Sequence, residues 1–206
     1  GLTINCFDER GEEVVHESFR FDGGVVDFVD WLSNDGAVTD TWHIRGEGTF
    51  TETVQALDPE SGHLRAVETE RICEVDCALR WGIGYDAQLE SFVNIIATPK
   101  GGTHVAGFEQ AILKVLRSQV DKNARKLKVG AKDGRPEKDD ILAGMTAVVT
   151  VRFPEPQFEG QTKEILGTPQ IRTVVARVVG DWLESKFASS KRDDKQQTSA
   201  LLEKVV

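Results

Sequence analysis

The sequence contains few cysteines and no long apolar segment. Three cysteines occur among 206 residues, and so small and odd a number argues against a disulfide framework and favours a reducing compartment. No apolar run approaches the roughly 18 residues that a membrane-spanning helix requires, and Gly1 to Asn5 lack the basic segment of a signal peptide. We therefore expect a soluble, cytoplasmic protein without membrane contact. Because residue 1 is not Met, we also expect a piece of a longer protein.

Positive charge is also scarce. The chain has 25 basic and 34 acidic residues, a formal net charge of −9, which is the wrong sign for a dedicated nucleic-acid binder. Residues 122–138 are the exception, because seven basic residues stand there against Asp133 and Glu137. This composition favours a mobile, solvated loop. The alternative is a surface that contacts the phosphate backbone of DNA.

Several site motifs are missing. The chain has no Walker A motif, and the glycine-rich turn Gly101–His104 lacks the lysine of a phosphate-binding loop. His104 has no partner at a catalytic spacing, so we expect it to pack or to form a local hydrogen bond. Cys73 and Cys77 lie in a segment of strict apolar alternation, and on a strand they are about 13 Å apart, too far to share one zinc ion. We therefore expect buried cysteines and no metal site.

Apolar periodicity predicts the secondary structure. Alternation and β-branched residues predict strands at 2–7, 14–21, 41–47, 72–81, 89–97 and 145–153. The first two are expected to form a hairpin through a turn at 9–12, and a further turn is expected at 58–62. Helical spacing and capping residues predict helices that begin near 24, at 103 (ending near 120), at 137 (ending near 142) and at 169.

The two longest predicted helices carry apolar stripes that are typical of helices packed on a sheet. The stripe residues are Phe108, Ala111, Ile112, Val115, Leu116 and Val120 in the first, and Ile171, Val175, Val178 and Trp182 in the second. Together with the strands they predict an α+β fold in which helices cover one face of the sheet. Residues 188–206 are polar, and we expect a linker or a helix there.

Residues 154–163, Pro-Glu-Pro-Gln-Phe-Glu-Gly-Gln-Thr-Lys, follow the last predicted strand. Pro154 and Pro156 lack backbone N–H groups, so the strand must end there. Gly160 provides a permissive backbone joint before the lysine. A single lysine on a polar loop is usually solvated, so the spacing alone makes Lys163 no more than a candidate phosphate ligand.

Residues 145–167 and 91–104 resemble the transducer domain of the B subunit of bacterial type IIA DNA topoisomerases, gyrase B and topoisomerase IV B. Two shorter segments, 46–52 and 74–81, extend the resemblance, and their form is more similar to the actinobacterial topoisomerase IV type than to gyrase proper. The resemblance covers the chain from residue 1 to about residue 187. It implies a ribosomal protein S5 domain 2-like fold, a mixed sheet with a left-handed crossover.

The resemblance also implies a division into domains and a site. Residues 1–22 are then the last hairpin of a preceding GHKL-type ATPase domain, 23–187 the transducer domain, and 188–206 a linker or helix towards the next domain. In such domains a glutamine and a lysine contact the γ-phosphate of ATP, and these correspond to Gln161 and Lys163. ATP and Mg²⁺ are bound mainly by the preceding domain.

The implied function is to couple ATP hydrolysis to DNA gate movement and strand passage, as part of an ATP-dependent isomerase; the isolated piece is expected to be inactive. The implied partners are DNA, the topoisomerase A subunit, the ATPase and TOPRIM domains of the same chain, and a second copy of the B subunit on ATP binding. Glu109 replaces a basic residue found in many gyrase B proteins, which argues against direct DNA contact there. The alternative is a non-catalytic nucleic-acid-binding or interaction module of the same fold that uses residues 122–138.

Overall fold

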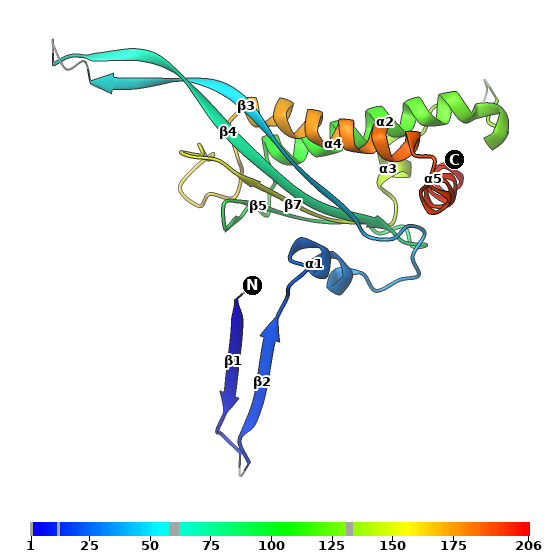
Figure 1. Cartoon of the computed structure of the whole chain (residues 1–206), viewed down its shortest axis with the longest axis horizontal. Helices are drawn as coiled ribbons and strands as arrows, with labels where there is room; N and C mark the ends of the chain where they lie inside the picture. Colours follow the sequence, from blue (N-terminus) through cyan, green and yellow to red (C-terminus); the bar gives the residue numbers. More distant parts are fainter. Residues whose placement is uncertain (1, 12, 58–61, 131–133) are drawn as a thin grey trace.

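The computed structural model describes residues 2–11, 13–57, 62–130 and 134–206. Its main feature is a mixed five-stranded sheet in the order β3-β4-β7-β5-β6 (Figure 1). Neighbouring strands are antiparallel except for β5 and β7, which run parallel. The strands are β3 (Trp42–Leu57), β4 (Leu64–Trp81), β5 (Gln88–Val93), β6 (Ile96–Ala97) and β7 (Met145–Arg152).

Two long helices, α2 (Thr103–Leu127) and α4 (Gln170–Ala188), pack side by side on one face of the sheet (Figure 1). All six residues of the predicted α2 stripe are buried, as their spacing of three and four requires. In α4 the predicted Val178 and Trp182 are only half-buried. The buried positions of α4 are Ile171, Val174, Val175, Val179 and Leu183. The main hydrophobic core therefore lies between these helices and the sheet.

Two further helices belong to the same layer. The short helix α3 (Lys138–Leu142) begins with a capping box formed by Glu137 and Asp140. The last helix, α5 (Arg192–Lys204), contacts both α2 and α4 and contributes Leu201 and Leu202 to the main core. Residues 188–206 thus include a packed helix.

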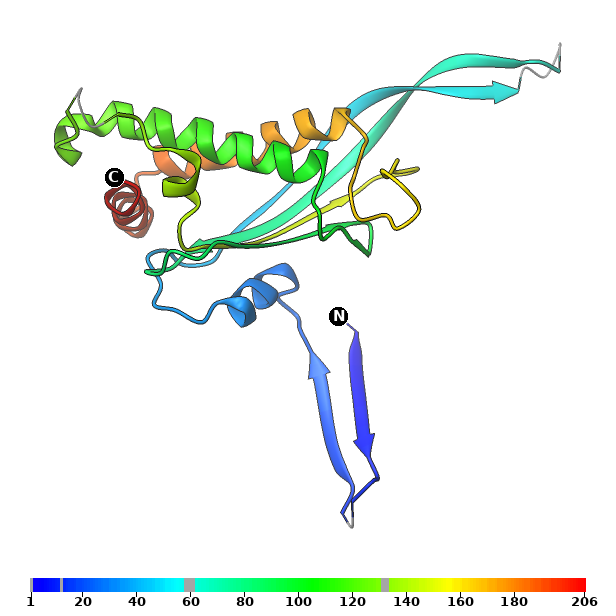
Figure 2. The same ribbon diagram turned by 180° about the vertical axis from the view of Figure 1, so that it is seen from behind.

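Helix α1 (Val25–Leu32) lies on the opposite face of the sheet (Figure 2). Its Val29 is buried against Ala78 of β4 and Val148 of β7. The prediction that helices cover only one face is therefore wrong. On this face, β4 and β7 each present only one buried apolar residue. One such residue does not disturb the alternation of apolar and polar side chains along a strand, and that alternation predicts a face exposed to solvent.

The first two strands, β1 (Thr3–Asp8) and β2 (Val15–Arg20), form a separate antiparallel hairpin that extends away from the sheet (Figure 1). The predicted hairpin is confirmed, although Glu12 of its turn lies outside the described residues. Its apolar side chains, such as Phe7 and Phe19, are exposed. A two-stranded sheet is marginally stable alone, so these side chains are suited to a further layer of protein.

Strands β3 and β4 are longer than predicted and continue beyond the sheet. They pair with each other along their whole length, whereas β4 pairs with β7 only from residue 74 onwards. We call residues 49–57 and 64–72 the ribbon (Figure 1). Its sequence is largely polar, which is why the apolar pattern did not predict it. Most of the predicted turn at 58–62 lies outside the described residues.

The basic segment 122–138 is not a single loop. Helix α2 continues to Leu127 and ends at Lys128, which adopts the left-handed conformation with φ 59°. The loop prediction is therefore wrong for residues 122–127, because the helix outlasts its apolar stripe. Lys132 and Asp133 lie outside the described residues.

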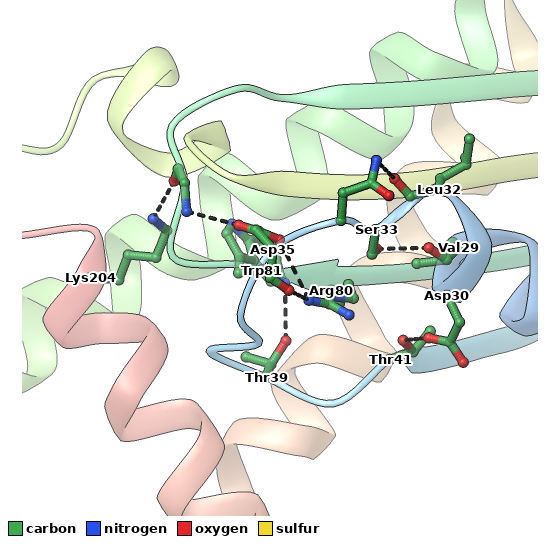
Figure 3. Close-up of polar contacts among 12 residues, drawn as sticks. Val29, Asp30, Leu32, Ser33, Asp35, Thr39, Thr41, Arg80, Trp81 and Lys204 are labelled. Atoms are coloured by element: carbon green, nitrogen blue, oxygen red, sulfur yellow. Dashed lines mark hydrogen bonds and ion pairs between the residues drawn. The ribbon is translucent and has the colours of Figure 1, made fainter.

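Polar contacts fix the connection from α1 to β3 at one end of the sheet (Figure 3). Arg80 Nη2 donates to the backbone oxygen of Asp35 at 2.8 Å, and the Asp35 carboxylate accepts from the backbone N–H of Gly84 at 2.8 Å. Lys204 Nζ of α5 donates to the oxygen of Gly84 at 2.8 Å. These contacts hold the β4–β5 turn to elements from both faces of the sheet.

Candidate functional site

The loop between β7 and α4, residues 154–168, protrudes beyond the end of β7 (Figure 1). The strand ends at Arg152, just before the two prolines, as predicted. Phe153 anchors the start of the loop, because its N–H donates to Asn94 Oδ1 at 3.1 Å and its ring lies edge-on to Phe50 with 5.7 Å between centroids. The loop therefore begins from a packed position.

The two branches of the loop pair with each other. The N–H of Gly167 donates to the oxygen of Gln157 at 2.8 Å, and the N–H of Glu159 donates to the oxygen of Ile165 at 2.9 Å. These bonds close the end of the loop, and we call residues 160–163, which include both predicted site residues, the tip. The tip thus rests on a short hydrogen-bonded stem.

The second branch is held by the N-terminus of α2. Leu166 donates its N–H to the oxygen of Gly101, and its oxygen accepts from the N–H of Thr103, both at 3.0 Å; we call this pair of bonds the Leu166 clasp. The Leu166 side chain is fully buried. A Cβ on Gly102 would lie 2.4 Å from the backbone N and O of Leu166, so the clasp requires glycine there.

The structure brings Gln161 and Lys163 together at the tip, and both are exposed. Lys163 has φ 57°, and its Nζ lies 5.9 Å from the centroid of the Phe158 ring. Within the described ranges no carboxylate lies within ion-pair distance of Lys163. The tip therefore presents an ammonium and an amide that are available to an anionic ligand.

Two ion pairs flank the tip, one on each branch. Lys100 Nζ lies 2.7 Å from Glu164 Oε2, and this hydrogen bond lowers the pKa of the Glu164 carboxyl. On the first branch, Arg71 of β4 lies 3.0 Å from Glu155. Neither pair can be predicted from the sequence, because each joins segments far apart in the chain and no local pattern marks such a pair.

His104, at the start of α2, is fully buried. Its Nε2 lies 3.2 Å from Thr98 Oγ1, which in turn lies 2.7 Å from Ser91 Oγ. Burial lowers the pKa of His104 to about 4, so the ring is neutral at neutral pH. The prediction of a local hydrogen bond and a packing role is confirmed.

Cys73 and Cys77 are both fully buried in the main core. Burial raises the pKa of the Cys73 thiol to about 12 and also raises that of Cys77. Both side chains are therefore protonated apolar packing groups, as the alternating pattern predicts. In the part of the chain that the structure describes, no three His, Cys, Asp or Glu residues gather as a metal site would require.

Several basic residues of segment 122–138 are engaged within the chain. Arg135 pairs with Asp121 at 2.9 Å, and Lys138 pairs with Glu109 at 2.7 Å. Glu109, which departs from the resembled pattern, thus neutralises a member of the basic segment. None of the described helices is long and apolar enough to span a membrane.

Residues 24–206 match the family model for DNA gyrase B. The chain belongs to the DNA gyrase B family. Curated relatives in this family include the DNA gyrase B protein of Streptomyces coelicolor, 37% identical over 205 residues, which cover 89% of this chain and 27% of that protein. The DNA gyrase B protein of Campylobacter jejuni is 36% identical over 186 residues, 90% of this chain and 21% of that protein. The chain thus spans about a quarter of the length of these gyrase B relatives.

Two solved structures share this fold. The 43K ATPase domain of Thermus thermophilus gyrase B, in complex with an aminocoumarin, superimposes with a TM-score of 0.64 and 28% identity over 91% of this chain and 44% of that chain. The topoisomerase IV ATP-binding domain of Francisella tularensis, in complex with a small-molecule inhibitor, has a TM-score of 0.62 over 99% of this chain and 48% of that chain. Its 22% identity shows the common fold alone.

Proposed function

We propose that this chain is the transducer portion of the B subunit of an ATP-hydrolysing type IIA DNA topoisomerase, and that Gln161 and Lys163 contact the γ-phosphate of ATP. The observation that carries the proposal is the exposed loop tip, which presents Lys163 without a carboxylate partner in the described ranges. Membership of the DNA gyrase B family supports it.

The chemistry of this contact follows from charge. An ammonium donates a charge-assisted hydrogen bond to a phosphate oxygen, and it also stabilises the negative charge that develops as the bond to the β-phosphate breaks. The Gln161 amide can donate a second hydrogen bond. In this proposal the preceding ATPase domain binds Mg²⁺ and the rest of the nucleotide, while residues 1–22 are the last hairpin of that domain.

The anchoring of the loop provides the mechanical connection. The Leu166 clasp joins the loop to α2, and Phe153 joins it to β3 and to the turn between β5 and β6. Loss of the γ-phosphate removes the partner of Lys163, so residues 23–187 can rotate against the ATPase domain. The proposed result is coupling of ATP hydrolysis to a DNA gate, in a cytoplasmic complex with DNA, the A subunit, the TOPRIM domain and a second copy of the B subunit.

The test is DNA-stimulated ATP hydrolysis by the intact parent protein together with its A subunit. Lys163→Ala is expected to lower turnover by about 100-fold or more, the size of a lost transition-state charge contact. Lys163→Arg keeps the positive charge and is expected to retain more activity than Lys163→Ala. Lys195→Ala, at an exposed position of α5 outside segment 122–138, is the matched control and should leave turnover unchanged. Unchanged turnover in Lys163→Ala would contradict the proposal.

A binding module that uses residues 122–138 is the second candidate. The ion pairs of Arg135 and Lys138 with acidic residues of this chain reduce the positive charge that such a module would offer to DNA. Family membership also favours the transducer function over this alternative. We further propose the S5 domain 2-like fold with a left-handed crossover and the actinobacterial topoisomerase IV type, on the resemblance of segments 46–52 and 74–81.

A further inference from the structure

Arg71 lies where the ribbon leaves the sheet, next to the first branch of the site loop. Residue 74 is the first of β4 to pair with β7, so Arg71 has only β3 beside it in the strand register. Its guanidinium makes two contacts in different directions. Nε donates to Glu52 Oε1 at 2.7 Å, and Nη2 donates to Glu155 Oε2 at 3.0 Å.

The two contacts of Arg71 differ in burial. The Glu52 side chain is only 12% exposed and that of Arg71 only 23%, so their ion pair is a well-shielded contact within the ribbon. The Glu155 side chain is 71% exposed. Glu52 therefore fixes the orientation of the guanidinium, and the remaining N–H donor is directed at the loop, which the fork geometry of arginine allows.

Glu155 occupies a part of the loop with few other restraints. It stands between two prolines, which have no N–H to donate, and its φ of 53° is in the left-handed region that disfavours residues other than glycine. The second branch has the Leu166 clasp and the Lys100 pair. The contact with Arg71 gives the first branch a corresponding support.

We propose that Arg71 is a positioning residue for Lys163, which holds the first branch of the loop through Glu155 so that the tip stays at the γ-phosphate. The inference rests on the proposed function. Arg71 does not touch the nucleotide in this proposal. Its effect on ATP hydrolysis passes through the loop, and it disappears when Lys163 has no side chain to position.

The test is a set of double-mutant cycles in the intact parent protein with its A subunit and DNA. Glu155→Ala removes the loop contact but leaves the Arg71–Glu52 pair intact. A loss of turnover in this variant therefore reports the position of the loop and not a loss of folding. Arg71→Ala and Glu155→Ala are each expected to lower ATP turnover by about 5-fold, the size of a partly exposed ion pair. The KM for ATP should change by less than about 2-fold, because the preceding domain binds most of the nucleotide.

The decisive measurement is the Lys163→Ala background. In that background, neither Arg71→Ala nor Glu155→Ala should lower turnover further. With Lys163 intact, Arg71→Ala and Glu155→Ala combined should lower turnover no more than either change alone. Arg45→Ala, which removes an exposed pair with Asp76 on the other face of β3, is the matched control with unchanged turnover. Thermal midpoints of all variants identify any loss of folding.

Two failures are distinguishable. If Lys163→Ala leaves turnover unchanged, the proposed function itself is wrong. If Lys163→Ala lowers turnover but Glu155→Ala has no effect, or has an effect that multiplies independently with that of Lys163→Ala, then the positioning role of Arg71 is wrong and the proposed function stands.

Discussion

Helix α2 and the site loop are neighbours, but they are held in very different ways. The helix buries eight residues, most of them in the main core against α4 and the sheet. The loop at 154–168 has one fully buried apolar side chain, Leu166, and otherwise depends on single hydrogen bonds and ion pairs. Many apolar contacts therefore hold the helix together, whereas each part of the loop is held by one or two specific contacts. Loss of one loop contact should therefore leave the helices and the sheet folded but impair the site.

The largest expected effect is the loss of a buried α2 side chain. Leu116 is fully buried, so Leu116→Ala removes apolar contacts and leaves a cavity that costs about 2–5 kcal/mol of unfolding free energy. Urea unfolding monitored by circular dichroism measures it. The exposed Lys122→Ala on the same helix should change stability by less than about 0.5 kcal/mol. Equal effects of the two variants would contradict the assigned core.

A smaller effect is expected where the helix meets the loop. Gly102→Ala places a Cβ 2.4 Å from the backbone of Leu166 in a residue with φ 131°, which should cost about 1–3 kcal/mol. Amide hydrogen exchange of Leu166 should become faster, because the clasp is displaced. Gly134→Ala is the matched control, since its φ is also positive at 74° but nothing lies within 4 Å of the added Cβ. Unchanged exchange at Leu166 would show that the clasp is not required.

A third effect depends on pH and concerns His104. Because burial lowers the folded-state pKa to about 4 from an ordinary value of 6.5, the unfolded chain binds more protons between these values. Stability is therefore lost as the pH falls from about 6.5 towards 4, by at most about 1.4 kcal/mol per pH unit. His104→Gln should reduce this slope in urea unfolding. An equal slope in wild type and variant would contradict a neutral buried ring.

The sequence predicted the elements whose side chains repeat at the period of the secondary structure. The α2 stripe and the inward cysteines of β4 are buried as expected, because burial of one face imposes that period. The sequence places α1 on the wrong face because β4 and β7 each present only one buried apolar residue there, and it does not predict the ribbon because that segment is largely polar. The contact between Arg71 and Glu155 joins residues 84 positions apart. No local pattern reports such a pair, so only the structure could reveal it.

The parallel pairing of β5 with β7 also determines how the domain is assembled as it folds. The whole of α2 lies between these two strands in the chain, and the bond from Thr103 Oγ1 to the oxygen of Thr168 joins residues 65 positions apart. The entropy of closing so long a segment must be offset before these contacts stabilise the chain. We therefore expect the loop to acquire its final shape only after α2 has docked on the sheet, so that a nascent chain gains its core before its site.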